Sequence, residues 1–222
     1  MTVARTDFEG DSNVGAFGVV TDGFVFVSSN MSEKSMEMIQ RTFNLPVVQS
    51  TVATLDAVGI MSAATSGGIV VPYTTTEDEL ARLKRAADFN VDWIDNKMTA
   101  LGNIILANDK GALCHPDFDA ASIQKIEDTL GVEVVKGTIA RLPLVGANAV
   151  ANNHGAVAHP LATSEELERI RDVLKVDVEV GTVNRGSPYT RLGVLANATG
   201  LLAGYETTGV ELAHISQVLG FV

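Results

Sequence analysis

The sequence predicts an α+β protein in which a small unit, ordered strand, strand, helix, strand, is repeated five times and closed into a ring. Three features predict it. A Val-Gly or Leu-Gly pair recurs about every 44 residues, a turn rich in Asn, Asp, Thr and Gly follows each pair between two short apolar runs, and a helix-start signal follows several of these turns. Self-similarity at a fixed period is the signature of a repeat architecture.

The recurring glycines set the length of the unit. They are separated by 44, 43, 44 and 47 residues and are Gly15, Gly59, Gly102, Gly146 and Gly193. One domain is expected over residues 1–222. Its repeats are expected at about 13–56, 57–99, 100–143, 144–190 and 191–222, with 1–12 closing the ring.

The first half of each unit is predicted to be a β-hairpin. Asn108 to Gly111 and Asn152 to Gly155 each join two apolar runs, and Asn and Gly tolerate the backbone conformations that tight connections demand. We therefore expect the turn conformation to require Gly111, so that valine at this position would impair folding.

A helix is predicted after the hairpin. Three repeats carry Thr followed three residues later by Glu, the spacing of a capping box, in which each residue satisfies a free backbone donor of the other. The pairs are Thr76 with Glu79, Thr163 with Glu166, and Thr208 with Glu211. Apolar residues then recur at helical period, which gives each helix one face to bury.

A third extended run ends the unit, and it indicates how the chain closes. Residues 176–182 alternate apolar and polar side chains, as a half-buried strand does. The last copy ends before a third strand of its own, and it stays apolar up to Phe221 and Val222, whereas an open array would need a polar cap. We expect Thr2 to Phe8 to supply the missing strand and close the ring.

Charge excludes several classes of function. Sixteen Lys and Arg against 27 Asp and Glu leave a formal net charge of -11, the wrong sign for a protein that grips DNA or RNA through its phosphates. No apolar run approaches the roughly 18 residues needed to span a bilayer. The one cysteine cannot form an internal disulfide, so a cytoplasmic location is expected. Nothing in the sequence argues for self-association, and we expect a monomer.

The residues that could carry chemistry do not form a catalytic or metal-binding pattern. Cys114 lies mid-strand, and its counterpart one repeat later is Ala158, so a small buried core residue is the preferred interpretation. His115 and His159 are repeat-equivalent and each precedes proline, which indicates a structural role at a strand end. The four histidines are scattered. We therefore expect no catalytic residue, no metal site and no cofactor.

The order of these motifs resembles one known family. Residues 100–103, 108–109, 115–117, 155–160, 181–187 and 207–212 carry it. Over 13–218 they resemble the translation initiation factor 6 family of archaea and eukaryotes. The resemblance implies the pentein or β/α-propeller fold and a ribosome anti-association factor. Such a protein binds the large (50S) ribosomal subunit, prevents its association with the small one, and takes part in large-subunit biogenesis.

The resemblance also implies a partner and a contact surface. The family docks chiefly on ribosomal protein L14, near the sarcin-ricin loop of the large rRNA. Because the eukaryotic C-terminal tail has no counterpart here, the chain is similar to the archaeal form.

Five residues are expected at this ribosome contact. Asn103 matches an asparagine that the family uses, and Ile60 takes the equivalent place one repeat earlier, where many relatives carry arginine. Arg141, with Asn184 and Arg185 one repeat later, follows the third strand of its repeat in a comparable place. We therefore expect these three residues at the same end of the ring.

Two rival functions follow from the same residues. The pentein fold also hosts guanidine-modifying enzymes with a nucleophilic cysteine, for which Cys114 is the candidate. A repeat scaffold for another protein complex is the other rival. The absence of a catalytic pattern in the sequence favours a binding protein that is not an enzyme.

Overall fold

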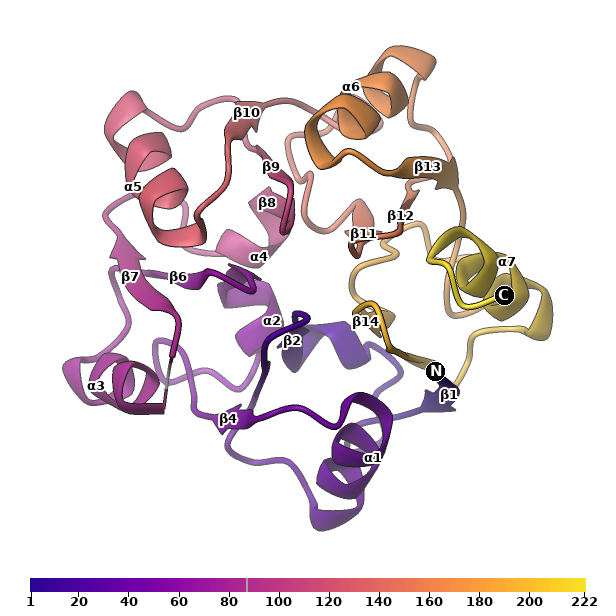
Figure 1. Ribbon diagram of the computed structural model, residues 1–222, viewed down its shortest axis with the longest axis horizontal. Helices are drawn as coiled ribbons and strands as arrows, with labels where there is room; N and C mark the ends of the chain where they lie inside the picture. Colours follow the sequence, from indigo (N-terminus) through magenta and orange to yellow (C-terminus); the bar gives the residue numbers. More distant parts are fainter. Residues whose placement is uncertain (87) are drawn as a thin grey trace.

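The computed structural model describes residues 1–86 and 88–222. Five three-stranded sheets stand around a central axis, and one long helix lies outside each sheet (Figure 1). This arrangement confirms the predicted α+β ring of five ββαβ repeats, the pentein architecture. No helix of the described residues is both long and apolar enough to cross a membrane.

Each sheet has an inner, a middle and an outer strand. The inner and middle strands are antiparallel, and the outer strand is parallel to the middle one. In the order inner, middle, outer, the sheets are β2 (Gly18–Val20), β3 (Val25–Val27) and β4 (Val47–Gln49); β5 (Ala63–Thr65), β6 (Gly68–Pro72) and β7 (Asn90–Ile94); β8 (Ile105–Asn108), β9 (Gly111–Cys114) and β10 (Val134–Lys136); β11 (Ala149–Ala151), β12 (Gly155–Ala158) and β13 (Asp177–Val180); and β14 (Val194–Ala196), β15 (Gly200–Gly204) and β1 (Thr2–Thr6).

Two kinds of helix connect the strands. The long outer helices are α1 (Glu33–Phe43), α3 (Glu77–Ala86), α5 (Ala120–Leu130), α6 (Ser164–Leu174) and α7 (Gly209–Val218). The short helices precede the inner strands and are η1 (Val14–Ala16), α2 (Val58–Met61) and α4 (Leu101–Ile104). The predicted capping boxes are present at the starts of α6 and α7, and Thr76 and Glu79 make the same pair of bonds at α3.

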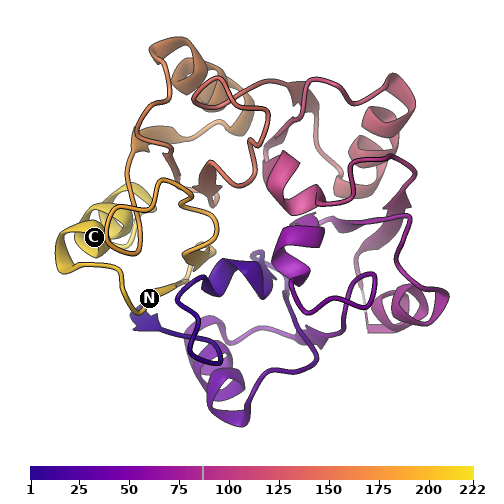
Figure 2. The same ribbon diagram turned by 180° about the vertical axis from the view of Figure 1, so that it is seen from behind.

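The N-terminal strand completes the fifth sheet. β1 pairs in parallel with β15, from Thr2 opposite Gly200 to Thr6 opposite Gly204. Arg5 adds a hydrogen bond from Nη1 to the carbonyl oxygen of Thr207 (2.9 Å). The two ends of the chain therefore lie in the same part of the ring, and the first strand joins the first repeat to the last (Figures 1 and 2).

The ring has two different ends. The hairpin turns between inner and middle strands form one, which we call the hairpin-turn end. The short helices, with the loops that lead from each outer strand into the next repeat, form the other, which we call the short-helix end. Figure 2 shows the short helices gathered around the axis on this second face.

Asparagines of the hairpin turns link neighbouring repeats. Asn108 Nδ2 donates to the carbonyl oxygens of Asn152 (3.1 Å) and Leu174 (2.9 Å) in the next repeat. Asn152 repeats the pattern with Asn197 (3.0 Å), and Asn197 donates in turn to Thr21 (3.0 Å) of the first repeat. Each of these asparagines, which the sequence predicts as turn residues, therefore also binds its turn to the next repeat.

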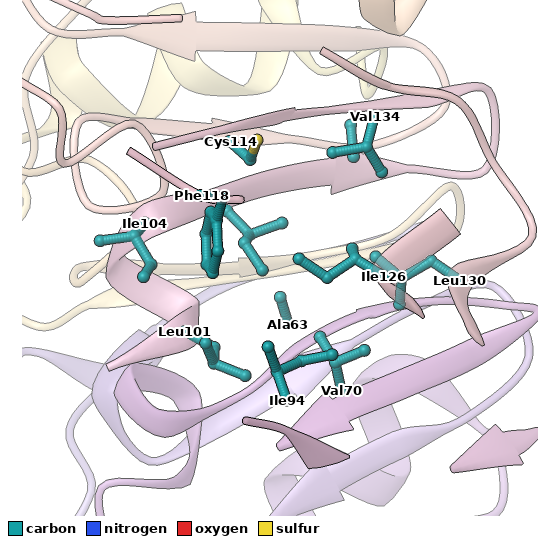
Figure 3. Close-up of a cluster of buried hydrophobic side chains, with 12 residues drawn as sticks. Ala63, Val70, Ile94, Leu101, Ile104, Cys114, Phe118, Ile126, Leu130 and Val134 are labelled. Atoms are coloured by element: carbon teal, nitrogen blue, oxygen red, sulfur yellow. The ribbon is translucent and has the colours of Figure 1, made fainter. Parts of the chain in front are cut away.

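The hydrophobic core lies between repeats rather than within them. Helix α5 packs against β6 and β7 of the preceding repeat as well as against its own sheet. Figure 3 shows the resulting cluster, in which Val70 and Ile94 of the second sheet meet Ile126 of α5 and Cys114 of the third sheet. A single unit cannot bury this face alone, which is why the repeats must assemble.

The recurring glycines lie where neighbouring repeats come closest, and we call each of these contacts a joint. A Cβ atom on Gly59 would overlap the carbonyl oxygen of Gly15, one on Gly102 would overlap that of Gly59, and one on Gly146 would overlap that of Gly102. The obstacle is backbone in each case, so it cannot move aside as a side chain can. The glycines therefore recur at a fixed period because each lies where two neighbouring repeats approach most closely.

The fifth joint differs from the sequence prediction. A Cβ on Gly15 would overlap the carbonyl oxygen of Arg191, so Arg191 takes the place that the four glycines occupy elsewhere. Gly193 instead lies against the side chains of Val183 and Asn184. The prediction that Gly193 is the fifth equivalent glycine is wrong by two residues.

Gly111 also needs a different explanation. Its backbone is not left-handed, so the turn conformation does not require glycine here. A Cβ would instead overlap the carbonyl oxygen of Val173, near the end of the next outer helix. The expected sensitivity to valine therefore rests on close packing between repeats.

Substitution of a joint should destabilise the ring. We expect Gly102→Ala to lower the free energy of unfolding by about 2 kcal/mol or more, because overpacking against backbone forces the chain to shift. Gly209→Ala is the control, since nothing lies within 4 Å of a Cβ there, and it should change stability by less than about 0.5 kcal/mol. Urea unfolding measures the stability of both variants. Equal free energies of unfolding for Gly102→Ala and Gly209→Ala would contradict the proposed close contact at Gly102.

Candidate docking surface

The loops of the short-helix end are tight and carry several of the predicted site residues. Loops 52–55, 139–142 and 183–187 are each closed by a small antiparallel bridge. Arg141 and Arg185 both have φ of 61°, and Asn184 has φ of 49°. Non-glycine residues adopt this left-handed conformation at a cost, so something must hold these loops in place.

Glu166 holds the loop that carries Arg141. Its carboxylate accepts hydrogen bonds from the backbone N–H groups of Ala140 (2.9 Å) and Arg141 (2.8 Å) and from the hydroxyl of Thr138 (2.8 Å). It also accepts from the N–H of Thr163 (2.9 Å), as the capping box requires. One carboxylate thus anchors the start of α6 and the loop beside it.

The same device occurs in two other repeats. Glu211 accepts from the N–H groups of Arg185 (3.2 Å) and Gly186 (2.8 Å) and from the hydroxyl of Thr182 (2.8 Å). Glu79 accepts from Thr51 and from the N–H of Thr54. Sequence reasoning found these glutamates only as helix caps. Their second role could have been suspected from the Thr that lies two residues after each preceding outer strand.

The hydrogen bonds also set the ionisation of these glutamates. Burial raises the pKa of Glu166, but the bonds from Thr163, Arg141, Thr138 and Ala140 outweigh it, so that pKa lies below its ordinary value of 4.5. The pKa values of Glu79 and Glu211 are lowered by the same balance. All three carboxylates are therefore charged at neutral pH.

Asn103 lies in α4, close to the axis on the short-helix end. Its main-chain carbonyl accepts from the N–H groups of Gly146 (3.0 Å) and Ala147 (3.1 Å), which fixes the backbone in the joint. Its side-chain Oδ1 is buried and has no hydrogen-bond partner among the described residues. A buried acceptor without a partner is costly and is normally satisfied. Because the side chain of Asn103 is half-buried, a turn of its amide would present this oxygen to a donor from outside the chain.

The other predicted residues surround Asn103 on the same end. Ile60 of α2 occupies the equivalent position one joint earlier and is half-buried, and Arg141 and Arg185 are both exposed in their loops. Large apolar side chains are also exposed on these connections, where they add apolar area to the surface. They are Leu55, Leu142, Leu144 and Tyr189.

The side chain of Asn184, unlike those of Arg141 and Arg185, makes hydrogen bonds within the chain. Its Nδ2 donates to the carbonyl oxygen of Ser12 (2.9 Å), and its Oδ1 accepts from the hydroxyl of Thr207 (3.0 Å). Both ends of the amide are therefore committed within the chain. Asn184 ties the fourth repeat's loop to the N-terminal segment, and it positions Arg185 beside it.

Comparison with known proteins gives the family. A sequence model of the eIF-6 family matches residues 3–218. The chain belongs to the eIF-6 family. Relatives named translation initiation factor 6 are similar along their whole length, so the role of the chain is that of a translation initiation factor. The relative from Pyrococcus furiosus is 44% identical, with 100% of both chains covered.

Other relatives show the same full-length match at lower identity. The protein from Pyrobaculum aerophilum is 39% identical over 95% of this chain and 96% of its own. That from Haloquadratum walsbyi is 35% identical over 98% and 96%. Among solved structures, the cyanobacterial arginine dihydrolase ArgZ is 16% identical, with a TM-score of 0.48 over 75% of this chain and 27% of its own.

The eIF-6 family name does not denote an enzyme, and Cys114 agrees with it. Its side chain is fully buried in the core cluster of Figure 3, among residues such as Phe118 and Val134. Burial raises the pKa of the thiol to about 11, so it is protonated at neutral pH and is not the nucleophile of a guanidine-modifying enzyme.

Two of the four histidines have structural roles. His115 Nδ1 accepts from the N–H of Asp117 (3.0 Å), and His159 Nδ1 accepts from the N–H of Leu161 (3.0 Å), which confirms their equivalent places at strand ends. Within residues 1–86 and 88–222, no three side chains of His, Cys, Asp or Glu come together as metal ligands.

Removing the charge of Glu166 should loosen the loop that it holds. We expect Glu166→Gln to lower the free energy of unfolding at pH 7 by about 1 to 3 kcal/mol, because an amide cannot accept all four hydrogen bonds. Since folding lowers the pKa of Glu166, its contribution is present above pH 4.5 and is lost as the pH falls through the folded value. The difference from wild type should therefore shrink between pH 7 and pH 3.

The control for this prediction is the neighbouring Glu165, which is exposed. Glu165→Gln should leave stability within about 0.5 kcal/mol of wild type at both pH values. Denaturant unfolding at each pH measures both variants. A Glu166→Gln protein as stable as Glu165→Gln at pH 7 would contradict the role of Glu166 in holding the loop.

Proposed function

We propose that this protein binds the large (50S) ribosomal subunit through its short-helix end and thereby prevents association with the small subunit. In this proposal it acts in translation initiation and in large-subunit biogenesis. The partner surface is ribosomal protein L14, near the sarcin-ricin loop of the large rRNA. The protein works as a rigid obstacle and performs no reaction.

The free amide of Asn103 is the observation that carries the proposal. It lies at the ring joint of an eIF-6 family member with a buried acceptor that the chain leaves unused. Ile60, Arg141 and Arg185 come from different repeats and share the same end, with exposed apolar side chains among them. A surface with buried polar anchors, arginines and apolar groups has the composition of a protein interface.

The two ends of the ring carry different charged groups. At the hairpin-turn end, the carboxylates of Asp22 and Asp109 gather near the axis, where Asn153 Nδ2 donates to both (2.6 and 2.7 Å). Rigid carboxylates repel rRNA phosphates, whereas Arg141 and Arg185 attract them. With a net charge of -11, the contact is expected to be led by a protein partner.

Sedimentation tests the proposal directly. The protein is incubated with purified archaeal 50S subunits and run on a sucrose gradient. It should migrate with 50S, and its addition before 30S subunits should reduce the 70S peak. Migration only at the top of the gradient, with the 70S peak unchanged, would refute the proposal.

Truncation of Asn103 should weaken binding without unfolding the protein. We expect Asn103→Ala to raise the dissociation constant for 50S about tenfold or more, because interface hot spots typically contribute 1 to 4 kcal/mol. The thermal midpoint should change little. Asn90→Ala is the matched control, since Asn90 is exposed and pairs with Gly68 toward the hairpin-turn end. Equal binding by the two variants would exclude Asn103 from the contact.

Removal of the Arg141 charge should affect the rate of association. We expect Arg141→Gln to slow binding to 50S several-fold at low salt, and to differ less from wild type as salt rises, because steering by exposed charges is screened. Lys84→Gln on the outer helix α3 removes the same charge far from the short helices and should bind like wild type. Stopped-flow measurement at two salt concentrations compares them, and equal rates would contradict the assigned role.

A further inference from the structure

A narrow cavity lies on the axis of the ring, enclosed by the inner strands. It has a volume of about 40 Å³ and is lined mainly by small or aliphatic side chains of all five sheets, such as Val19, Ala63 and Ala107. A second cavity of about 30 Å³ adjoins it toward the hairpin-turn end and shares its alanines, including Ala64 and Ala151. The two together form an axial channel.

Arg191 is the charged residue that lines the inner cavity. It occupies the position that glycine fills at the other four joints, as shown by its carbonyl oxygen beside Gly15. At those joints there is no side chain to reach the axis. At the fifth joint there is a guanidinium, so the fivefold pattern of the channel is broken by one positive charge.

The charge of Arg191 has no counter-ion among residues 1–86 and 88–222. None of the ion pairs among the described residues includes it. Burial alone lowers the pKa of its guanidinium to about 10, so the group stays protonated at neutral pH. The side chain is half-buried, so a small solute can reach its guanidinium.

A protonated guanidinium inside a protein is costly unless a partner compensates it. The carboxylates nearest the axis, Asp22 and Asp109, line the other cavity and are engaged with Asn153. The described residues that line the cavity of Arg191 include no acidic side chain.

The size of the cavity limits what can compensate the charge. A volume of about 40 Å³ is about three times the roughly 10 to 15 Å³ that a cavity needs to hold one water. A monatomic halide with one or two waters fits this space. The lining residues include one cationic side chain, that of Arg191, and no acidic one, which suits an anion and not a cation.

We propose that the axial cavity is a binding site for one small monovalent anion of chloride size, held by the guanidinium of Arg191. The anion neutralises the buried charge and stabilises the closed ring at the joint that lacks a glycine. The site lies on the axis of the ring, at the fifth joint, and its ligand differs from the ribosomal partner assigned to the short-helix end.

Crystals of the full chain soaked in sodium bromide test the site. Bromide replaces chloride and scatters anomalously, so a peak should appear in the axial cavity within hydrogen-bond distance of the Arg191 guanidinium. Data from the same crystal form in sodium nitrate should lack that peak. A cavity that holds only water after the bromide soak would overturn the proposal.

Thermal unfolding gives a second readout in solution. At constant ionic strength, replacing gluconate by about 0.5 M chloride should raise the midpoint of the wild-type chain by about 2 to 4 °C, since a ligand of the folded state stabilises it. Arg191→Met should lose this response, whereas Arg82→Met on the exposed face of α3 should keep it. An equal chloride response in Arg191→Met would refute the site. If that variant does not fold, the bromide experiment on the wild-type chain decides the question.

Discussion

The ring depends on the close approach of neighbouring repeats at the leading glycines. Three consecutive joints place the α-carbon of one glycine against the carbonyl oxygen of the previous one, from Gly15 through Gly59 and Gly102 to Gly146. Because a repeat buries its helix against the sheet of the preceding repeat, the units have no separate cores. The joints therefore fix the spacing between repeats, and the core between repeats supplies the stability. β1 then closes the ring by completing the fifth sheet.

The rigid ring is what allows residues distant in sequence to act as one surface. Each outer strand leads through a tight loop into the next short helix, so every connection of this kind reaches the same end. The carboxylates of Glu79, Glu166 and Glu211 fasten three of these loops to the starts of the outer helices. Arg141 and Arg185 thus stand on strained but anchored backbone, beside the joint that carries Asn103. A preorganised surface of this kind loses little entropy when it binds.

The sequence alone predicts the repeats, the hairpins, the helix caps and the common end of Arg141 and Arg185, because each depends on short local patterns. It misses features that depend on two repeats at once. The position of the fifth joint is one such feature. The Leu192-Gly193 pair matches the repeated motif, but the residue that packs against Gly15 is Arg191, and only the contact between repeats shows this. The second role of Glu166 is another, because its bonds reach 28 residues back along the chain to Thr138. The internal bonds of Asn184 are a third, because Ser12 lies 172 residues away.

A map of the ring bound to the large subunit tests the central claim most directly. Electron cryomicroscopy of purified 50S particles incubated with the protein would show which end faces the particle. The account predicts density for the whole ring on the subunit-joining surface, with α2 and α4 in contact and the turns of Asp22 and Asp109 facing solvent. A ring docked through those turns, or contact only along the outer helices, would contradict it.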